Sequence, residues 1–218
     1  MKYYAVKNGL VPGIYTSWDE CRKQITGFSN AVYKSFSRKE DAEKFLNNSR
    51  EERYSDDSPI AYVDGSYDAG SGTYSYGAVI IYDGKEVWLS NSYSNDKLAE
   101  MNNVAGELMG SMCSMNYALR NGISKLLIVY DYAGVKNWCT GDWRCKTSGT
   151  SLYKRYYDEI SKILHIHFRK VKGHSGHYYN NLADSLARDA LGLANESNKR
   201  LLNDASKSRR VERRVFGL

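Results

Sequence analysis

The chain has 218 residues, of which 42% are hydrophobic, and a formal net charge of +6. This length allows one large domain, or an ordinary domain with a small one beside it. The chain has no apolar run of about 18 residues and no apolar signal-peptide core at its N-terminus, so we expect no membrane span and no membrane partner.

The positive charge is concentrated at the two ends of the chain. Residues 1–46 carry eight basic and five acidic side chains, and residues 195–218 carry seven and three. Basic ends with aromatic residues indicate a polyanion partner, although ordinary solvated lysines explain the charge equally well. The four cysteines have neither zinc spacing nor a disulfide pattern, so we expect reduced thiols in a cytoplasmic protein. We also expect the protein to be a monomer.

Residues 1–46 have the pattern of a small module in the order ββαβα. Short apolar segments at 3–6, 14–16 and 32–36 predict three strands. Ser17 and Ser37 each begin a Ser-x-x-Glu capping box, which predicts helices over about 18–26 and 38–46. Residues 47–58 are polar without apolar periodicity, so we expect a linker.

From residue 59 the strands become longer and later alternate with helices. Strands are expected at 60–64, 76–82, 85–93, 126–130 and 165–171, and helices at 103–121, 133–139, 152–164 and 178–193. Asp83-Gly84 is typical of a two-residue hairpin turn. The pattern over 59–194 predicts an α/β fold in which helices flank a mixed five-stranded sheet.

Four acidic residues lie where this fold could bring them together. Asp64 and Asp131 end two strands that can be neighbours, whereas Glu107 and Asp184 lie on helices that can pass over the same edge. Clustered carboxylates repel one another, and hard divalent ions such as Mg²⁺ resolve that repulsion. For any one of these acids, a surface charge or a helix cap is the more common interpretation.

The residues around these acids resemble the Asp-Glu-Asp-Asp motifs of type 1 ribonucleases H. The matching segments are Val63-Asp64-Gly65-Ser66, Asn103-Val104-Ala105-Gly106-Glu107, Val129-Tyr130-Asp131, and Gly173-His174-Ser175-Gly176-His177 followed by Ala183-Asp184. The resemblance implies a ribonuclease H-like fold and hydrolysis of the RNA strand of RNA/DNA hybrids by a two-metal mechanism. It also implies two Mg²⁺ ions held by the four acids, with Mn²⁺ as a substitute, and products with 5′-phosphate and 3′-hydroxyl ends.

Further site residues follow from the same resemblance. His174 is expected to assist proton transfer or product release. Asn103 and Asn180 are expected to contact substrate, Asn180 with the alternative of orienting Asp184. The backbone at Gly65 and Ser66 is a candidate for reading the 2′-hydroxyl of RNA. Trp138 resembles a tryptophan that packs against the DNA strand, and core packing is its alternative.

The first 46 residues resemble the hybrid-binding domain found at the N-terminus of many type 1 ribonucleases H. The segments that carry the likeness are Tyr3-Tyr4-Ala5-Val6-Lys7, Ser17-Trp18-Asp19-Glu20-Cys21 and Tyr33-Lys34-Ser35-Phe36. Carried over to this chain, the residues that grip the hybrid are Trp18, Tyr33 and Lys34. Double-stranded RNA is a second expected partner of this module, and burial in a small core is the alternative for both aromatic residues.

Residues 195–218 are expected to form a solvated basic tail, with a helical extension or a phosphate-binding helper as alternatives. Two other functions remain open from the residues alone. One is a catalytically weak or inactive protein that binds RNA/DNA hybrids or double-stranded RNA. The other is a different nuclease or a transposase of the same fold.

Overall fold

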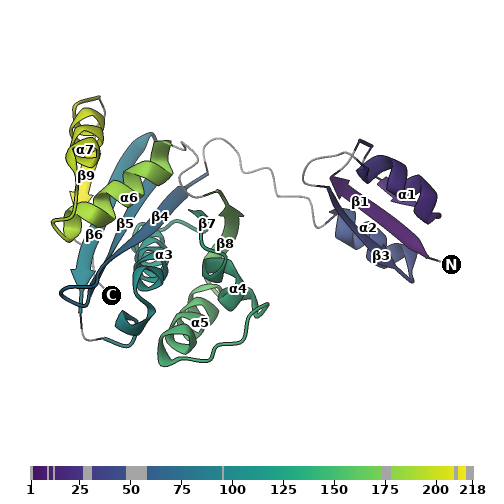
Figure 1. Ribbon diagram of the computed structural model, residues 1–218, viewed down its shortest axis with the longest axis horizontal. Helices are drawn as coiled ribbons and strands as arrows, with labels where there is room; N and C mark the ends of the chain where they lie inside the picture. Colours follow the sequence, from purple (N-terminus) through teal and green to yellow (C-terminus); the bar gives the residue numbers. More distant parts are fainter. Residues whose placement is uncertain are drawn as a thin grey trace. The chain divides into compact units, whose positions relative to one another are not determined.

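The computed structural model describes residues 2–8, 10–11, 13–26, 31–47, 58–94, 96–172, 178–208 and 211–214. The chain forms two compact units, Met1–Ser55 and Asp56–Leu218 (Figure 1). Most of the predicted linker and the whole 173–177 loop, with His174, lie outside the described residues.

The N-terminal unit is a three-stranded antiparallel sheet with two helices. Its elements are β1 (Tyr3–Asn8), β2 (Gly13–Tyr15), α1 (Trp18–Ile25), β3 (Val32–Phe36) and α2 (Lys39–Asn47), with the strand order β2-β1-β3. The Ser17 hydroxyl accepts a hydrogen bond from the Glu20 backbone N–H at 3.3 Å, which caps α1 as predicted. The expected ββαβα order is confirmed.

The second unit is built on one mixed sheet. Its elements are β4 (Ile60–Asp68), β5 (Thr73–Tyr82), β6 (Lys85–Tyr93), the 3₁₀ turn η1 (Ala99–Met101), α3 (Asn103–Arg120), β7 (Lys125–Tyr130), α4 (Gly134–Thr140), α5 (Ser148–Ile160), β8 (His165–Lys170), α6 (Tyr178–Ala190), α7 (Glu196–Ser208) and β9 (Val211–Arg214). The strand order is β8-β7-β4-β5-β6-β9. β4, β5 and β6 are antiparallel, whereas β7 is parallel to both β4 and β8.

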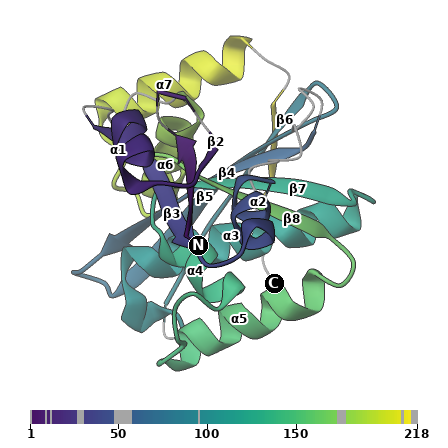
Figure 2. The same ribbon diagram turned by 90° about the vertical axis from the view of Figure 1, so that its right-hand side faces the viewer.

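Helices cover both faces of this sheet. Figure 2 shows α6 and α7 on one side and α3, α4 and α5 on the other. Side chains alternate along β5 accordingly: Ala78 and Ile80 belong to the large core under α3, and Val79 belongs to a smaller core under α6. The expected α/β architecture, a mixed sheet flanked by helices, is confirmed. No helix among the described residues is long and apolar enough to cross a membrane.

The expected solvated tail is wrong for the described part of residues 195–218. Helix α7 buries Leu202 and Ala205 against Trp88, and β9 pairs with β6 in parallel from Val211 opposite Glu86. The sheet therefore has six strands where five were expected. Val211 is the only apolar residue in β9, so this strand has almost no local signal in the sequence.

Candidate active site

Asp64 lies at the middle of strand β4, whereas the sequence had suggested that it ends the strand. The strand pairs with β5 over nine positions, from Ile60 to Asp68. Its parallel partner β7 pairs only as far as Tyr62 opposite Val129. Asp64 therefore lies just beyond the point where the pairing of β4 with β7 ends, and it lines an opening there.

Glu107 reaches the same opening from the second turn of α3. Its side chain is 3% exposed, and its carboxylate oxygen Oε2 accepts a hydrogen bond from the backbone N–H of Tyr132 at 3.3 Å. α3 can approach β4 this closely because the contact is made by two glycines, Gly65 and Gly106. The hydrogen bond ties the helix to the segment that follows β7.

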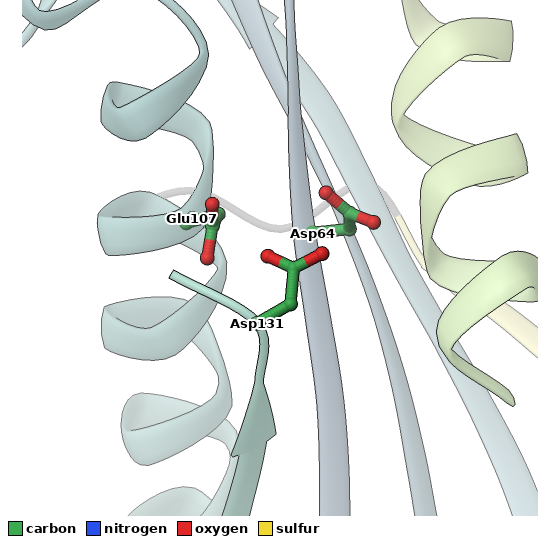
Figure 3. A group of neighbouring side chains, drawn as sticks. All are labelled: Asp64, Glu107 and Asp131. Atoms are coloured by element: carbon green, nitrogen blue, oxygen red, sulfur yellow. The ribbon is translucent and has the colours of Figure 1, made fainter. Parts of the chain in front are cut away.

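Asp131 comes directly after the last residue of β7. The three carboxylates of Asp64, Glu107 and Asp131 each offer an oxygen, and these oxygens lie within 4.8 Å of one another (Figure 3). They come from a strand, a helix and the end of a second strand. Carboxylate oxygens at this spacing are the donor set that hard divalent ions such as Mg²⁺ take in proteins.

The electrostatics of the cluster favour a bound cation. Burial, followed by the charges of Asp131 and Asp184, raises the pKa of Asp64 to about 8, against hydrogen bonding from Gly65 N–H and the charge of Arg188. Burial, followed by Asp131 and Asp64, raises the pKa of Glu107 to about 9. Without a cation, the cluster keeps protons near neutral pH. A divalent ion would replace those protons, so the residues present fit a metal.

Asp184 lies on α6 and lines the same pocket, but its carboxylate is engaged elsewhere. Its Oδ1 accepts a hydrogen bond from Arg188 Nε, one helical turn away, at 2.8 Å. Among the described residues, Asp64, Glu107 and Asp131 are the acids that lie close enough to one another to share an ion. The four predicted acids therefore share one pocket, and three of them are in mutual contact range.

The pocket has a volume of about 510 Å³. Besides the four acids, it is lined by Gly65, Ser66 and Asn103, which the sequence predicted, and by Tyr67, Asn102, Arg188 and Leu193, which it did not. The spacing of Arg188, four residues after Asp184, could have indicated an ion pair. Leu193 was expected on the last turn of the final helix, but α6 ends at Ala190 and Leu193 follows a glycine turn, where it lines the pocket.

Asn180 is not among the residues that line this pocket. Its side chain is 3% exposed, and its Oδ1 has no hydrogen-bond partner among the described residues. The residue lies on α6 in the turn before Asp184. The burial of Asn180 therefore argues against a direct contact with substrate.

Trp138 lines a second pocket, of about 300 Å³, with Tyr132, Arg144 and Lys146 among its other residues. Its ring lies 5.9 Å from that of Tyr132 and 5.5 Å from that of Trp143, between centroids. Trp138 also packs against the large core. The core-packing alternative is therefore confirmed in part, and the contact with the DNA strand stays a prediction. Trp143, which is 39% exposed, is an aromatic residue that the sequence analysis missed.

In the N-terminal unit, Trp18 and Tyr33 lie side by side on the surface. Their ring centroids are 5.8 Å apart, and they are 41% and 45% exposed, so core packing does not account for them. Tyr4, which the sequence analysis missed, extends the group at 5.7 Å from Trp18. Lys34 does not join them: its Nζ lies 5.7 Å from the Phe36 ring centroid, because neighbouring residues of a strand point to opposite faces.

Both units match known families. A family model described as the ribonuclease H1 N-terminal domain matches residues 2–46, and the RNase H family model matches residues 56–192. Together these matches cover most of both units and end before α7 and β9.

Individual relatives agree with the family models. Ribonuclease H of Pseudoalteromonas translucida (strain TAC 125) is 32% identical over 154 residues, which cover 66% of this chain and 92% of that protein. Ribonuclease H1 of Rattus norvegicus is 22% identical over 253 residues, covering 86% and 88%. The crystal structure of RNase H1 from Halobacterium salinarum NRC-1 has the same fold, with a TM-score of 0.53 at 21% identity over 62% of this chain and 98% of that one.

Proposed function

The chain belongs to the ribonuclease H family and is a ribonuclease H enzyme, and from this premise we propose that it hydrolyses the RNA strand of RNA/DNA hybrids with two divalent metal ions. The products would carry 5′-phosphate and 3′-hydroxyl ends. The observation that carries the proposal is the convergence of Asp64, Glu107 and Asp131 in one pocket of a family member.

The metal would be held by these three carboxylates, with Asp184 as a fourth ligand. We propose Mg²⁺, with Mn²⁺ as a substitute, because both prefer oxygen ligands. When bound, such ions activate a water and stabilise the leaving oxygen of a phosphodiester. The Tyr132 N–H fixes one oxygen of Glu107, and Gly65 N–H donates to Asp64 Oδ1 at 2.8 Å, so both carboxylates are oriented before any ion arrives.

Substrate recognition is proposed for residues at the rim of the pocket. Asn103 is exposed at the first turn of α3, and Ser66 follows Asp64 on β4, so both are within the pocket that the RNA strand would enter. The Asn103 amide and the Ser66 hydroxyl can form hydrogen bonds with a 2′-hydroxyl, which DNA lacks. His174 keeps its proposed role in proton transfer or product release on the family resemblance alone.

We further propose that the N-terminal unit holds the hybrid through Trp18 and Tyr33. Exposed aromatic rings stack on bases or sugars of any sequence, and that suits an enzyme that must act on many hybrids. Lys34 would contact a phosphate from the other face of β3. The protein would work as a monomer, with double-stranded RNA as a weaker ligand of this unit.

The decisive test is cleavage of an end-labelled RNA/DNA hybrid by the full chain in Mg²⁺. We expect cleavage of the RNA strand by the unmodified protein, its loss in Asp64→Asn, and full activity in Asp204→Asn, an exposed acid on α7 outside the pocket. Double-stranded DNA and RNA of the same sequence should remain intact. Tight hybrid binding without cleavage in Mg²⁺ or Mn²⁺ would instead establish an inactive hybrid-binding protein.

A further inference from the structure

The pocket contains one basic side chain, Arg188, among its described lining residues. Its guanidinium Nε donates to Asp184 Oδ1 at 2.8 Å, and the side chains are 40% and 20% exposed. The two residues are one turn apart on α6, so both face the pocket from the same side of that helix. Arg188 also acts on Asp64, where its charge lowers the pKa.

The arrangement leaves Asp184 in a different state from the other three acids. Asp64, Glu107 and Asp131 share a small space, whereas Asp184 already pairs with a basic side chain, that of Arg188. A divalent ion that uses Asp184 as a ligand would have to share its carboxylate with the guanidinium or take it over. The positive charge of Arg188 also repels any ion that enters the pocket.

We propose that Arg188 is a resident counter-cation that competes with the metal for Asp184, so that ion binding and the Arg188–Asp184 pair exclude one another. The inference rests on the proposed metal site and adds to it a residue that sets how tightly that site binds ions. Coupling of this kind is reciprocal: if the bound ion weakens the Arg188–Asp184 pair, the pair weakens ion binding by the same factor.

A role in positioning makes the opposite prediction. If Arg188 only held Asp184 in place for the metal, removing the guanidinium would weaken ion binding. If Arg188 competes, removing it strengthens ion binding. The sign of one measured affinity therefore separates the two roles, and this measurement does not depend on turnover.

The experiment is calorimetric titration of the metal-free full chain with Mg²⁺. We expect Arg188→Gln to bind Mg²⁺ at least about fivefold more tightly than the unmodified protein. Arg188→Lys keeps the charge and should stay close to the unmodified value. The matched control is Lys154→Gln, which removes one positive charge from another i,i+4 pair, that of Lys154 with Asp158 on α5.

A second measurement uses the unmodified protein and so does not depend on the folding of a variant. The Nε–H proton of Arg188, assigned by its loss in Arg188→Lys, is followed by NMR during the Mg²⁺ titration. We expect its resonance to shift and to exchange faster with water as the ion takes the carboxylate. An unchanged, protected Nε–H at saturating Mg²⁺, or weaker Mg²⁺ binding by Arg188→Gln, would overturn the proposal.

These outcomes are distinct from failure of the proposed function. A protein that binds Mg²⁺ in competition with Arg188 but leaves hybrids intact would retain this inference and lose the nuclease assignment. A protein in which no Mg²⁺ binding is detected would lose both.

Discussion

Gly65 on β4 and Gly106 on α3 lie so close that neither position has room for a Cβ atom. A Cβ on Gly106 would stand 1.9 Å from the carbonyl oxygen of Ser75 and 2.6 Å from the Gly65 Cα. A Cβ on Gly65 would stand 2.2 Å from the Asn103 carbonyl oxygen. This backbone-to-backbone contact brings Glu107, the next residue on α3, beside Asp64.

We expect Gly106→Ala to destabilise the catalytic unit by about 3 kcal/mol or more and to abolish cleavage. The atoms that a Cβ at position 106 would meet belong to backbone, so the helix itself must move, and Glu107 moves with it.

Gly110→Ala, one turn later on the same helix, is the matched control. Its nearest neighbours would be 3.5 Å away, and the better helix propensity of alanine should make it neutral or stabilising by up to about 1 kcal/mol. Thermal unfolding and hybrid cleavage would be measured for both. Equal stabilities of the two variants would contradict the packing argument.

The carboxylate cluster should make the metal-free protein less stable as pH rises. Asp64 and Glu107 lose their protons near pH 4 in the unfolded chain, but their folded pKa values are about 8 and 9. Between these limits the folded protein binds more protons than the unfolded chain, so the free energy of unfolding falls as pH rises from about 4 to 9.

Asp64→Asn removes one of the two carboxyl groups that cause this pH dependence, and it keeps a side-chain oxygen that can accept the hydrogen bond from the Gly65 N–H. We expect it to raise metal-free stability at pH 8 by about 2 kcal/mol, or about 4–8 °C in Tm.

The control for this prediction is Asp204→Asn, which removes an exposed acid on α7. Its unfolding temperature should follow that of the unmodified protein at every pH. Saturating Mg²⁺ should reverse the order at pH 8, because the ion stabilises only a protein that binds it. Identical pH profiles of Asp64→Asn and the unmodified protein without metal would argue against the raised pKa of Asp64.

The C-terminal helix and strand should contribute to the stability of the catalytic unit. Leu202 is 4% exposed and packs with Trp88 and Leu186, and the Arg213 guanidinium lies 4.8 Å from the Trp88 ring centroid. We expect Leu202→Ala to cost about 2–4 kcal/mol in chemical denaturation. The exposed neighbour Asn203 provides the control, and Asn203→Ala should change stability by less than about 0.5 kcal/mol. A Leu202→Ala variant as stable as that control would restore the solvated tail.

The aromatic surface of the N-terminal unit should govern affinity for the hybrid. We expect Trp18→Ala to weaken hybrid binding by about 1–3 kcal/mol, or about 5- to 150-fold, because a stacked ring is lost. Leu10→Ala changes an exposed apolar residue of the same unit, 63% exposed and outside the aromatic group, and should bind normally. Binding would be measured by fluorescence anisotropy with Asp64→Asn as the background, which prevents cleavage.

Deletion of residues 1–46 should weaken hybrid binding and lower activity on long hybrids while leaving some cleavage. The reason is that the pocket and all four acids belong to the second unit. Equal hybrid affinity of the truncated and full chains would refute a binding role for the N-terminal unit.

Local patterns in the sequence were enough for much of the fold. The Ser17 cap, the order of strands and α-helices from β1 to α6, and the apolar face of α3 depend on residues within a few positions of one another, so they could be predicted from spacing alone. The resemblance to a family added the identities of Asp64, Glu107, Asp131 and Asp184, because motif order survives when the intervening sequence changes.

Tertiary structure decided where those residues meet and what else meets them. β4 runs on past Asp64 because β5 pairs with it over its full length, and no residue in β4 encodes the point at which β7 stops. β9 becomes a sixth strand because α7 returns the chain to the edge of β6. The sequence by itself determined which acids this protein has and the strands and α-helices from β1 to α6. Their distances, the Arg188–Asp184 pair and the proton affinity of the cluster came from contacts between distant segments, which only packing in three dimensions creates.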